Sequence, residues 1–544
     1  METTVLAPRA LDAAALEKLM ARLGPLKVDA GEVAREAHAR DLSTLGHLGF
    51  ARGSLAGTGF RPPDAVVRAS SVDDVRAVLE LAREHGFAVV PWGAGSGVCG
   101  GSVAHLGGVV LDLKGLDRIL EIDPMSQLVR VEAGVNGQVL EDALQARGLT
   151  LGHFPSSITC STVGGWVAAR GAGQLSTRYG KIEDMVVSVE VVLPDGTLVR
   201  TPTVPRAATG PDWNHLFVGC EGTLGVIVSA TFRVHRLPAQ RLFRSFELPD
   251  LPAAIEAMRQ ALQRGARPSA VRLYDPLDTL LVARSGDAPP LPPPGEAPGE
   301  EDEPLPGPWP LSSFGLPRLL EAIRGAVPEA RHRLEHTALS HPAMLNRLTG
   351  RIPGVGWLLI LTCEGDPELA AAEARVCEEA CLAAGGVSRG PGPAETWWRN
   401  KLAVSFKQSA VYARGGFVDT MEVATTWREL ERLHTRVREA LAPHALVMAH
   451  FSHAYLEGCS IYFTFAALQG DPAGTLERYR AAWRDALAAV VEVGGAVSHH
   501  HGVGLLKADA LVAAHGPLHG VFREVKRALD PRNALNPGKL GLDP

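Results

Sequence analysis

The first half of the chain alternates between the apolar spacing of strands and that of helices. Residues 65–90, AVVRASSVDDVRAVLELAREHGFAVV, begin and end with short apolar runs and carry a helical period between them. Ser71 stands three residues before Asp74, a spacing typical of a helix N-terminus. The segment predicts a strand, a helix and a second strand, with a buried helix face formed by Val75, Val78, Leu79 and Ala82.

Strand and helix patterns continue up to residue 237. Residues 136–148 have the apolar spacing of a helix. Pro194, Asp195 and Gly196 interrupt one apolar run, which predicts a hairpin turn. The predicted strands lie within residues 108–113, 128–134, 185–200 and 225–237.

Changes in composition divide the chain into further parts. A helical segment is expected up to about Gly46, and glycine motifs become rare after Pro238 before they return at Gly494. Residues 288–310 are dense in proline and acidic side chains, which predicts an exposed insertion. We expect four parts: an N-terminal helical segment with its linker (residues 1–59), a first domain (60–237), a cap domain (238–493) and a C-terminal segment that completes the active site (494–544).

Composition and charge narrow the classes of function. The chain has 544 residues, 46% of them hydrophobic, and a formal net charge of -6. These values are typical of a multidomain globular protein and give no basic surface for nucleic acid. The longest apolar runs are too short to span a bilayer, and no secretory signal is recognisable. Cys377 and Cys381, four residues apart on a predicted helix, are expected to be reduced and packed in the protein core. We therefore expect a cytoplasmic enzyme.

Three glycine-rich stretches suggest a cofactor that carries phosphates. Gly95 to Gly100, GSGVCG, match G-x-G-x-x-G after a strand, but the following GSVAHLGGVVLDL lacks a helical period, which excludes a Rossmann loop. What remains is either a plain surface loop or a backbone nest for an anion. Residues 153–180 add glycines and small hydroxyl residues, and residues 221–227, EGTLGVI, stand at a strand start. Together they favour a long cofactor bound across one domain.

These stretches carry a resemblance to a known family. The order PWGAGSGVCGG, STVGGW, GKIEDMVVSVEVVLPDG and EGTLGVI resembles the FAD-binding domain of the vanillyl-alcohol oxidase and p-cresol methylhydroxylase flavoproteins. Within that superfamily, STVGGWVAAR, RPSAVRLYD, DTMEVATTW, CSIYFTFA and SHHHGVG resemble the alkyldihydroxyacetonephosphate synthases. The resemblance implies an α+β fold, with a two-subdomain FAD-binding domain, an α+β cap domain and a C-terminal segment that returns to the flavin.

The resemblance also implies which residues hold FAD. We expect non-covalent FAD, with Cys99 and Cys160 as small packed residues and not flavin attachment points. His153 is expected in the flavin region. The other implied cofactor residues are Pro91, Trp92, Gly93, Ala94, Gly95, Ser96, Gly97, Ser156, Ser157, Ile158, Thr159, Cys160, Ser161, Thr162, Ala169, Arg170, Gly171, Ala172, Glu221, Gly222, Thr223, Leu224, Gly225, Val226 and Ile227.

Three adjacent histidines, His499, His500 and His501, precede a glycine turn. On an extended segment the first and third would face one way and the second the other, so that a metal could bind only a pair of them. Neighbouring imidazoles also lower one another's pKa, which keeps some of them neutral near pH 7. We favour proton transfer beside the flavin over metal binding, and no metal is assigned.

The resemblance assigns roles to three further residues. Residues 459–466 have the alternation of a strand, in which the face turned to the core carries either Tyr462 and Thr464 or Ile461, Phe463 and Phe465. The resemblance makes Tyr462 the catalytic acid and base, assisted by the three histidines. Arg272 is placed close to the flavin, and the alternative for it is pairing with Asp275 or solvent. Lys407 stands where the synthases have an arginine suited to the substrate phosphate, and lysine lacks arginine's two-pronged geometry.

The function implied by the resemblance is exchange of the acyl group of acyl-dihydroxyacetone phosphate for a long-chain alcohol. The alternatives are an FAD-dependent dehydrogenase for 2-hydroxy acids such as D-lactate or glycolate, another FAD-linked oxidase, and a cofactor-binding protein without activity. We expect a lipid-like small-molecule substrate and no nucleic acid, and leave open a peripheral membrane contact and a homodimer. The chain ends in GLDP, so no Ser-Lys-Leu-type peroxisomal address is expected there.

Overall fold

The computed structural model separates the chain into two compact units, Met1–Leu237 with Ala496–Pro544, and Pro238–Gly495. Lys407 and the predicted insertion at residues 288–310 lie outside the described residues. No helix in the described part is both long and apolar enough to cross a membrane. The residues described are 10–51, 53–279, 342, 346, 354–402, 409–412, 415–468 and 471–544.

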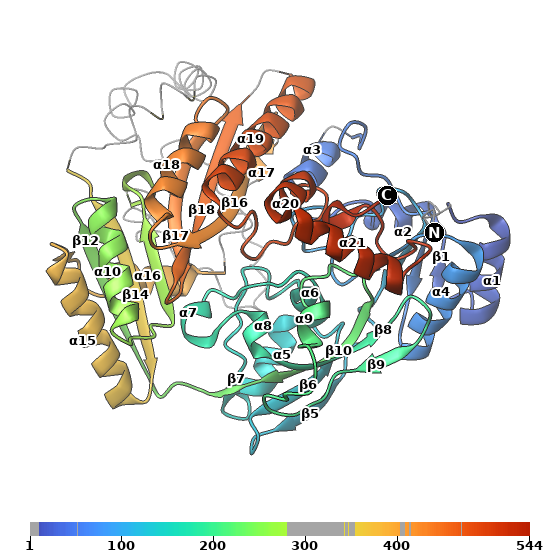
Figure 1. Ribbon diagram of the computed structural model, residues 1–544, viewed down its shortest axis with the longest axis horizontal. Coiled ribbons are helices and arrows are strands. Elements are labelled where there is room, and N and C mark those ends of the chain that lie inside the picture. The colour runs from blue at the N-terminus through green and yellow to red at the C-terminus, as the bar shows by residue number, and fades with distance from the viewer. Residues whose placement is uncertain are drawn as a thin grey trace, which may run out of the picture. The chain divides into compact units, whose positions relative to one another are not determined.

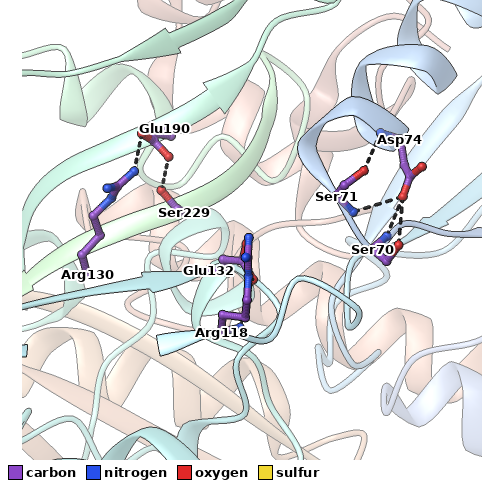
Figure 2. Close-up of polar contacts among 8 residues, drawn as sticks. All are labelled: Ser70, Ser71, Asp74, Arg118, Arg130, Glu132, Glu190 and Ser229. Carbon is purple, nitrogen blue, oxygen red and sulfur yellow. Dashed lines mark hydrogen bonds and ion pairs between the residues drawn. The ribbon is translucent and has the colours of Figure 1, made fainter. Parts of the chain in front are cut away.

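The first unit contains a four-stranded sheet in the order β1-β2-β4-β3, in which β2, β4 and β3 run parallel. The strand, helix and strand predicted for residues 65–90 are confirmed as β2, α4 and β3. Ser71 and Asp74 form a reciprocal capping box at the start of the helix (Figure 2), and the predicted apolar face of the helix is buried. The elements are α1 (Ala13–Leu23), β1 (Val28–Asp29), α2 (Glu32–Ala37), α3 (Thr44–Ala51), β2 (Ala65–Arg68), α4 (Val72–His85), β3 (Val89–Trp92) and β4 (Val109–Asp112). The N-terminal helical segment thus extends beyond Gly46.

A second, antiparallel sheet of the first unit has the order β5-β6-β10-β8-β9. The predicted hairpin joins β8 to β9, whereas β5 was not predicted. Figure 2 shows Glu190 on β8 accepting hydrogen bonds from Arg130 on β6 and Ser229 on β10, which ties three neighbouring strands together. The strands are β5 (Ile119–Asp123), β6 (Leu128–Glu132), β8 (Val186–Val192), β9 (Leu198–Arg200) and β10 (Val226–Arg233).

The C-terminal segment, Ala496–Pro544, belongs to the first unit (Figure 1). Leu535 forms a parallel bridge with Val89, so the segment extends the edge of the four-stranded sheet at β3. The remaining elements are α5 (Gly137–Gln145), β7 (Leu149–Thr150), α6 (Val163–Ala168), α7 (Ser176–Tyr179), α8 (Ile182–Met185), α9 (Asn214–Phe217), β11 (His235–Arg236), α20 (Ala508–His515), α21 (Pro517–Leu529) and the 3-10 turn Lys539–Gly541.

The second unit is built on a seven-stranded antiparallel sheet in the order β15-β12-β14-β13-β17-β18-β16. Helices α10, α15, α18 and α19 pack on this sheet (Figure 1). The strands are β12 (Gln240–Leu248), β13 (Ala270–Tyr274), β14 (Trp357–Gly365), β15 (Val387–Ser388), β16 (Gly416–Thr426), β17 (Leu446–Ala454) and β18 (Gly458–Leu468). The helices are α10 (Leu251–Gln263), α15 (Pro367–Ala383), α16 (Gly392–Asn400), α17 (Ser409–Tyr412), α18 (Leu430–Leu441) and α19 (Pro472–Val493).

The two faces of β18 differ, and this resolves the alternatives for Tyr462. Ile461, Phe463 and Phe465 are fully buried. Phe463 stacks on His434 of α18, and Phe465 meets a tryptophan of α19 edge to face. Because side chains alternate along a strand, Tyr462 lies on the opposite, partly buried face.

Candidate functional site

The glycine loop after β3 leaves almost no room for side chains. A Cβ atom on Gly93 would lie 2.3 Å from Thr162 Oγ1, and one on Gly95 would lie 2.2 Å from the Trp92 ring. Gly95 also has a φ of +64°, a conformation that favours glycine. Residues 93–108 contain no helix, which confirms that this is not a Rossmann loop.

The other predicted cofactor stretches meet this loop within the first unit. A Cβ on Gly222 would lie 2.8 Å from Pro91, so residues 221–227 pack against the loop. A Cβ on Gly171 would lie 3.9 Å from His153 Nε2, which places residues 169–172 beside that histidine. The structure therefore brings together the four stretches that the resemblance implies for FAD, residues 91–97, 153–162, 169–172 and 221–227.

Buried polar atoms without partners point into this region. Thr162 Oγ1 and both ring nitrogens of His153 are buried and have no hydrogen-bond partner in the part of the chain described. Burial lowers the pKa of His153 to about 3, so its imidazole is neutral, and its ring lies 4.6 Å from that of Trp166. Buried polar groups are normally satisfied. These atoms together with the glycine backbone fit a bound dinucleotide with polar groups.

The C-terminal segment is fastened to the loops through Glu221. The Glu221 carboxylate accepts hydrogen bonds from the N–H groups of Val503 at 2.6 Å and Gly504 at 2.8 Å. Asn536 Nδ2 donates to the carbonyl oxygens of Gly101 at 2.8 Å and Glu221 at 2.6 Å. The segment thus fixes two glycine-rich loops at once.

Two buried lysines add to this attachment. Lys526 Nζ donates to Thr223 O at 2.9 Å and pairs with Asp530 at 2.5 Å. Lys539 Nζ donates to Val103 O at 2.7 Å, and burial lowers the pKa of this lysine to about 7. These bonds join the C-terminal segment to Thr223 and Val103, which lie in two of the loops.

The three histidines do not alternate as predicted. Residues 497–501 are a bent segment and not a strand, so consecutive rings come into contact. His499 Nδ1 lies 2.9 Å from His500 Nδ1, and the rings of His500 and His501 lie 4.6 Å apart. A nitrogen-to-nitrogen hydrogen bond requires that one ring donates and the other accepts, which suits proton transfer. Lys181 Nζ donates to His499 O at 2.6 Å.

In the second unit, Arg272, His450 and Tyr462 gather on one face of the sheet. Arg272 Nη2 on β13 lies 2.7 Å from His450 Nε2 on β17. The imidazole stacks on the Tyr462 ring of β18, with 4.8 Å between centroids and 15° between planes. The Tyr462 hydroxyl accepts from Thr420 Oγ1 at 3.5 Å. The proposed alternative pairing of Arg272 with Asp275 is not found, because Asp275 pairs with Arg438.

Burial sets the protonation states of this cluster. It raises the pKa of Tyr462 above its ordinary value, so the phenol keeps its proton. Burial and then the charge of Arg272 hold the pKa of His450 well below its ordinary value. Burial also raises the pKa of Asp278 to about 6, and its Oδ2 lies 3.7 Å from His450 Nδ1. At neutral pH the cluster pairs a protonated phenol with a neutral imidazole and a fixed cation.

His450, Asp278 and Thr420 were not predicted to act with Tyr462. His450 pairs in register with Tyr462 across β17 and β18, and Thr420 lies on β16. A sequence signal existed only in the alternation of each strand, because the strand order was not known. Lys407, the predicted substrate-binding residue, lies outside the described residues.

Two protein-family models match the chain. One, described as FAD binding domain, matches residues 63–202. The other, described as FAD linked oxidases, C-terminal domain, matches residues 237–540, which is more than half of the 544 residues. These matches confirm the expected FAD cofactor.

Several curated relatives are similar over most of their length. Alkyldihydroxyacetonephosphate synthase of Trypanosoma brucei brucei is 28% identical over 498 residues, covering 88% of this chain and 73% of the relative. The uncharacterized FAD-linked oxidoreductase YgcU of Escherichia coli (strain K12) is 28% identical over 497 residues, covering 88% of this chain and 89% of the relative. Glycolate oxidase subunit GlcD of Bacillus subtilis (strain 168) is 26% identical over 483 residues, covering 88% of this chain and 89% of the relative.

Solved structures confirm the predicted α+β fold. An alkyldihydroxyacetonephosphate synthase superposes with a TM-score of 0.71 at 23% identity, covering 98% of this chain and 86% of that chain. A p-cresol methylhydroxylase with substrate bound also gives 0.71, at 19% identity, covering 99% of both chains. At such identities the likeness concerns the fold alone.

Proposed function

The chain belongs to the FAD-linked oxidases, and from this premise we propose that it exchanges the acyl group of acyl-dihydroxyacetone phosphate for a long-chain alcohol, which forms an ether. The relative from Trypanosoma brucei brucei that carries the synthase name supports this substrate class. The observation that carries the proposal is the cluster of Tyr462, His450 and Arg272, which can take up and return a proton beside a fixed positive charge.

In this proposal the loops of the first unit hold the cofactor. The backbone of residues 91–97 binds the pyrophosphate, and residues 153–162, 169–172 and 221–227 enclose the rest of FAD. Thr162 Oγ1 and His153 supply the free hydrogen-bonding atoms. When bound, FAD supplies a ring system that accepts electron density from the substrate. The attachment is non-covalent, with the Cys160 thiol kept protonated because burial raises its pKa.

Tyr462 acts as the acid and base of the exchange. A general base removes a proton from the carbon that bears the ester. The bond from this carbon to the ester oxygen breaks and the fatty acid leaves as its carboxylate, while the alcohol oxygen bonds to the carbon and loses its own proton to solvent. The general base then returns a proton to the carbon. The raised pKa of Tyr462 means that the phenol is a poor base alone. Tyr462 therefore needs a proton acceptor to work as a base, and proton transfer is the role that we propose for His499, His500 and His501.

Arg272 supplies the positive charge of the site. Its Nε is buried and has no hydrogen-bond partner among the described residues, and its Nη2 contacts a neutral imidazole and not a carboxylate. The guanidinium charge therefore remains available for an anionic group or developing negative charge. Lys407 is proposed to contact the substrate phosphate.

The proposal is tested by incubating the FAD-loaded protein with acyl-dihydroxyacetone phosphate and labelled hexadecanol, and measuring labelled ether product and released fatty acid. We expect ether formation without oxygen consumption. Tyr462→Phe should lower the rate at least a hundredfold, roughly the contribution of an acid-base group, while retaining FAD. Tyr479→Phe is the matched control, because it also removes a tyrosine hydroxyl, one that donates a buried hydrogen bond to Asp419 at 2.7 Å and has no proposed role in the reaction. Absence of ether with intact flavin would refute the proposal.

One alternative function has a specific observation in its favour. The relative named glycolate oxidase subunit GlcD is covered over 89% of its length. Oxidation of a 2-hydroxy acid requires a cation for the carboxylate and a nearby proton acceptor, and Arg272 with the histidines could supply both. Anaerobic bleaching of the flavin by D-lactate or glycolate, without ether formation from the lipid substrates, would favour this alternative.

A further inference from the structure

The hydrogen bond from Arg272 to His450 determines the tautomer of the imidazole. A guanidinium has only donors, so the 2.7 Å contact from Arg272 Nη2 requires His450 Nε2 to be the acceptor. A neutral imidazole with an unprotonated Nε2 carries its hydrogen on Nδ1. That nitrogen faces Asp278 Oδ2 at 3.7 Å, an oxygen that can accept.

The position of His450 in the sheet places it opposite a tyrosine on each neighbouring strand. It pairs in register with Tyr462 on one side and with Tyr274 on the other. Its ring lies nearly parallel to that of Tyr462, at 15°. The Arg272 guanidinium carbon lies 5.5 Å from the Tyr274 ring and 5.8 Å from the Trp397 ring, so aromatic groups also surround the cation.

A neutral acceptor has a different effect on Arg272 from that of a carboxylate. A carboxylate at this position would fix the guanidinium but would also neutralise it. A neutral imidazole fixes the guanidinium and leaves its charge uncompensated by direct contact. The Asp278 carboxyl group lies 3.7 Å from the other ring nitrogen of His450 and acts on the Arg272 charge from beyond direct contact.

We propose that His450 is a positioning residue, whose unprotonated Nε2 aims the charged Arg272 into the active site, with the protonated Nδ1 facing the Asp278 carboxyl group. The imidazole also supports the ring of Tyr462. The role rests on the proposed function in that Arg272 and Tyr462 are taken to act on the substrate. It extends that function by a residue that touches neither substrate nor cofactor.

The tautomer can be measured without any substrate. Ring nitrogens of the FAD-loaded protein labelled with ¹⁵N histidine are observed by NMR, and the His450 signals are assigned by their loss in His450→Gln. We expect an unprotonated Nε2 and a protonated Nδ1 at pH 7. A protonated Nε2, or a cationic ring, would overturn the proposal.

Two variants separate the hydrogen bond from the ring stacking. His450→Gln can place an amide oxygen near the position of Nε2 and so keeps an acceptor for Arg272, but it loses the aromatic ring. His450→Phe keeps a ring against Tyr462 and loses the acceptor. The loss of a hydrogen bond to a charged group predicts that His450→Phe lowers kcat/KM roughly 10- to 100-fold. His450→Gln should stay within about threefold of the parent. Equal losses, or an unaffected His450→Phe, would contradict the role.

His434 provides a matched control in the same unit. Its ring packs on Phe451 and Phe463, and its Nε2 has no partner among the residues described. His434→Phe should therefore leave kcat/KM unchanged. Flavin content and thermal unfolding of each variant show whether a loss reflects misfolding. If the predicted tautomer is found but no ether forms, the proposed function fails, while the His450 tautomer and its contact with Arg272 stand. If ether forms and the tautomer is reversed, only this inference fails.

Discussion

Gly93→Ala is expected to weaken FAD binding through one steric contact. The new Cβ would lie 2.3 Å from Thr162 Oγ1, far below an ordinary contact, while the next Thr162 atom would be 3.6 Å away. The φ of Gly93 is not in the left-handed region, so alanine can adopt the backbone conformation. The perturbation is therefore confined to the Thr162 hydroxyl.

The size of the effect follows from the cost of overpacking. Forcing a methyl group into a filled site costs about 1–3 kcal/mol. If the loop moves to relieve this contact, the same free energy is lost from FAD binding, which raises the Kd roughly 5- to 150-fold. Thr162→Ala should cost about 1 kcal/mol, because a single hydrogen bond to the cofactor is lost. In the double variant the clash is absent, and the remaining contact at 3.6 Å is ordinary.

The assay is titration of the apoprotein with FAD, followed by flavin fluorescence, for the parent, both single variants and the double variant. The double variant should bind about as well as Thr162→Ala alone, so the two losses are not additive. Gly520→Ala is the control, because a Cβ there meets no atom within 4 Å on helix α21. It should leave FAD affinity unchanged and stabilise the fold by up to about 1 kcal/mol. Additive losses would refute the proposed contact between the two loops.

Two further predictions concern the attachment of the C-terminal segment. Glu221→Ala removes the acceptor of the Val503 and Gly504 N–H groups and should lower the free energy of unfolding by about 2–4 kcal/mol, measured with urea; an unchanged midpoint would contradict the attachment. An unfolded lysine keeps its proton up to a pKa of 10.5, whereas Lys539 loses it at about 7 in the fold, so the unfolded state binds more protons between these values. Stability should therefore rise from pH 7 to 10, by at most about 5 kcal/mol, relative to Lys539→Met, and a flat difference would contradict the burial of this charge.

Local features of the fold could be predicted because their causes are local. The capping box of Ser71 and Asp74 depends on three-residue spacing, and the glycine loop at Gly93 to Gly97 could be separated from a Rossmann loop because no helical period follows it. The four cofactor stretches could be named only through resemblance to a family. Their mutual contacts depend on packing between distant loops.

The cluster around Tyr462 could not be predicted in full, because it depends on strand order. Arg272 and His450 become neighbours only when β13 pairs with β17, and no local pattern encodes this pairing. The expected alternation of the three histidine side chains was wrong for a different reason. It assumed an extended segment, whereas the chain bends before the turn at Gly502, so His499 and His500 share a hydrogen bond.

The most direct measurement uses acyl-dihydroxyacetone phosphate with two deuterium atoms on the carbon that bears the ester, incubated with the FAD-loaded protein and hexadecanol. Removal of a proton by Tyr462 predicts that the ether product, analysed by mass spectrometry, carries one deuterium and one hydrogen from solvent at that carbon. An ether that retains both deuterium atoms would show that the alcohol displaces the acyl group without proton removal, and would contradict the role of the Tyr462 cluster.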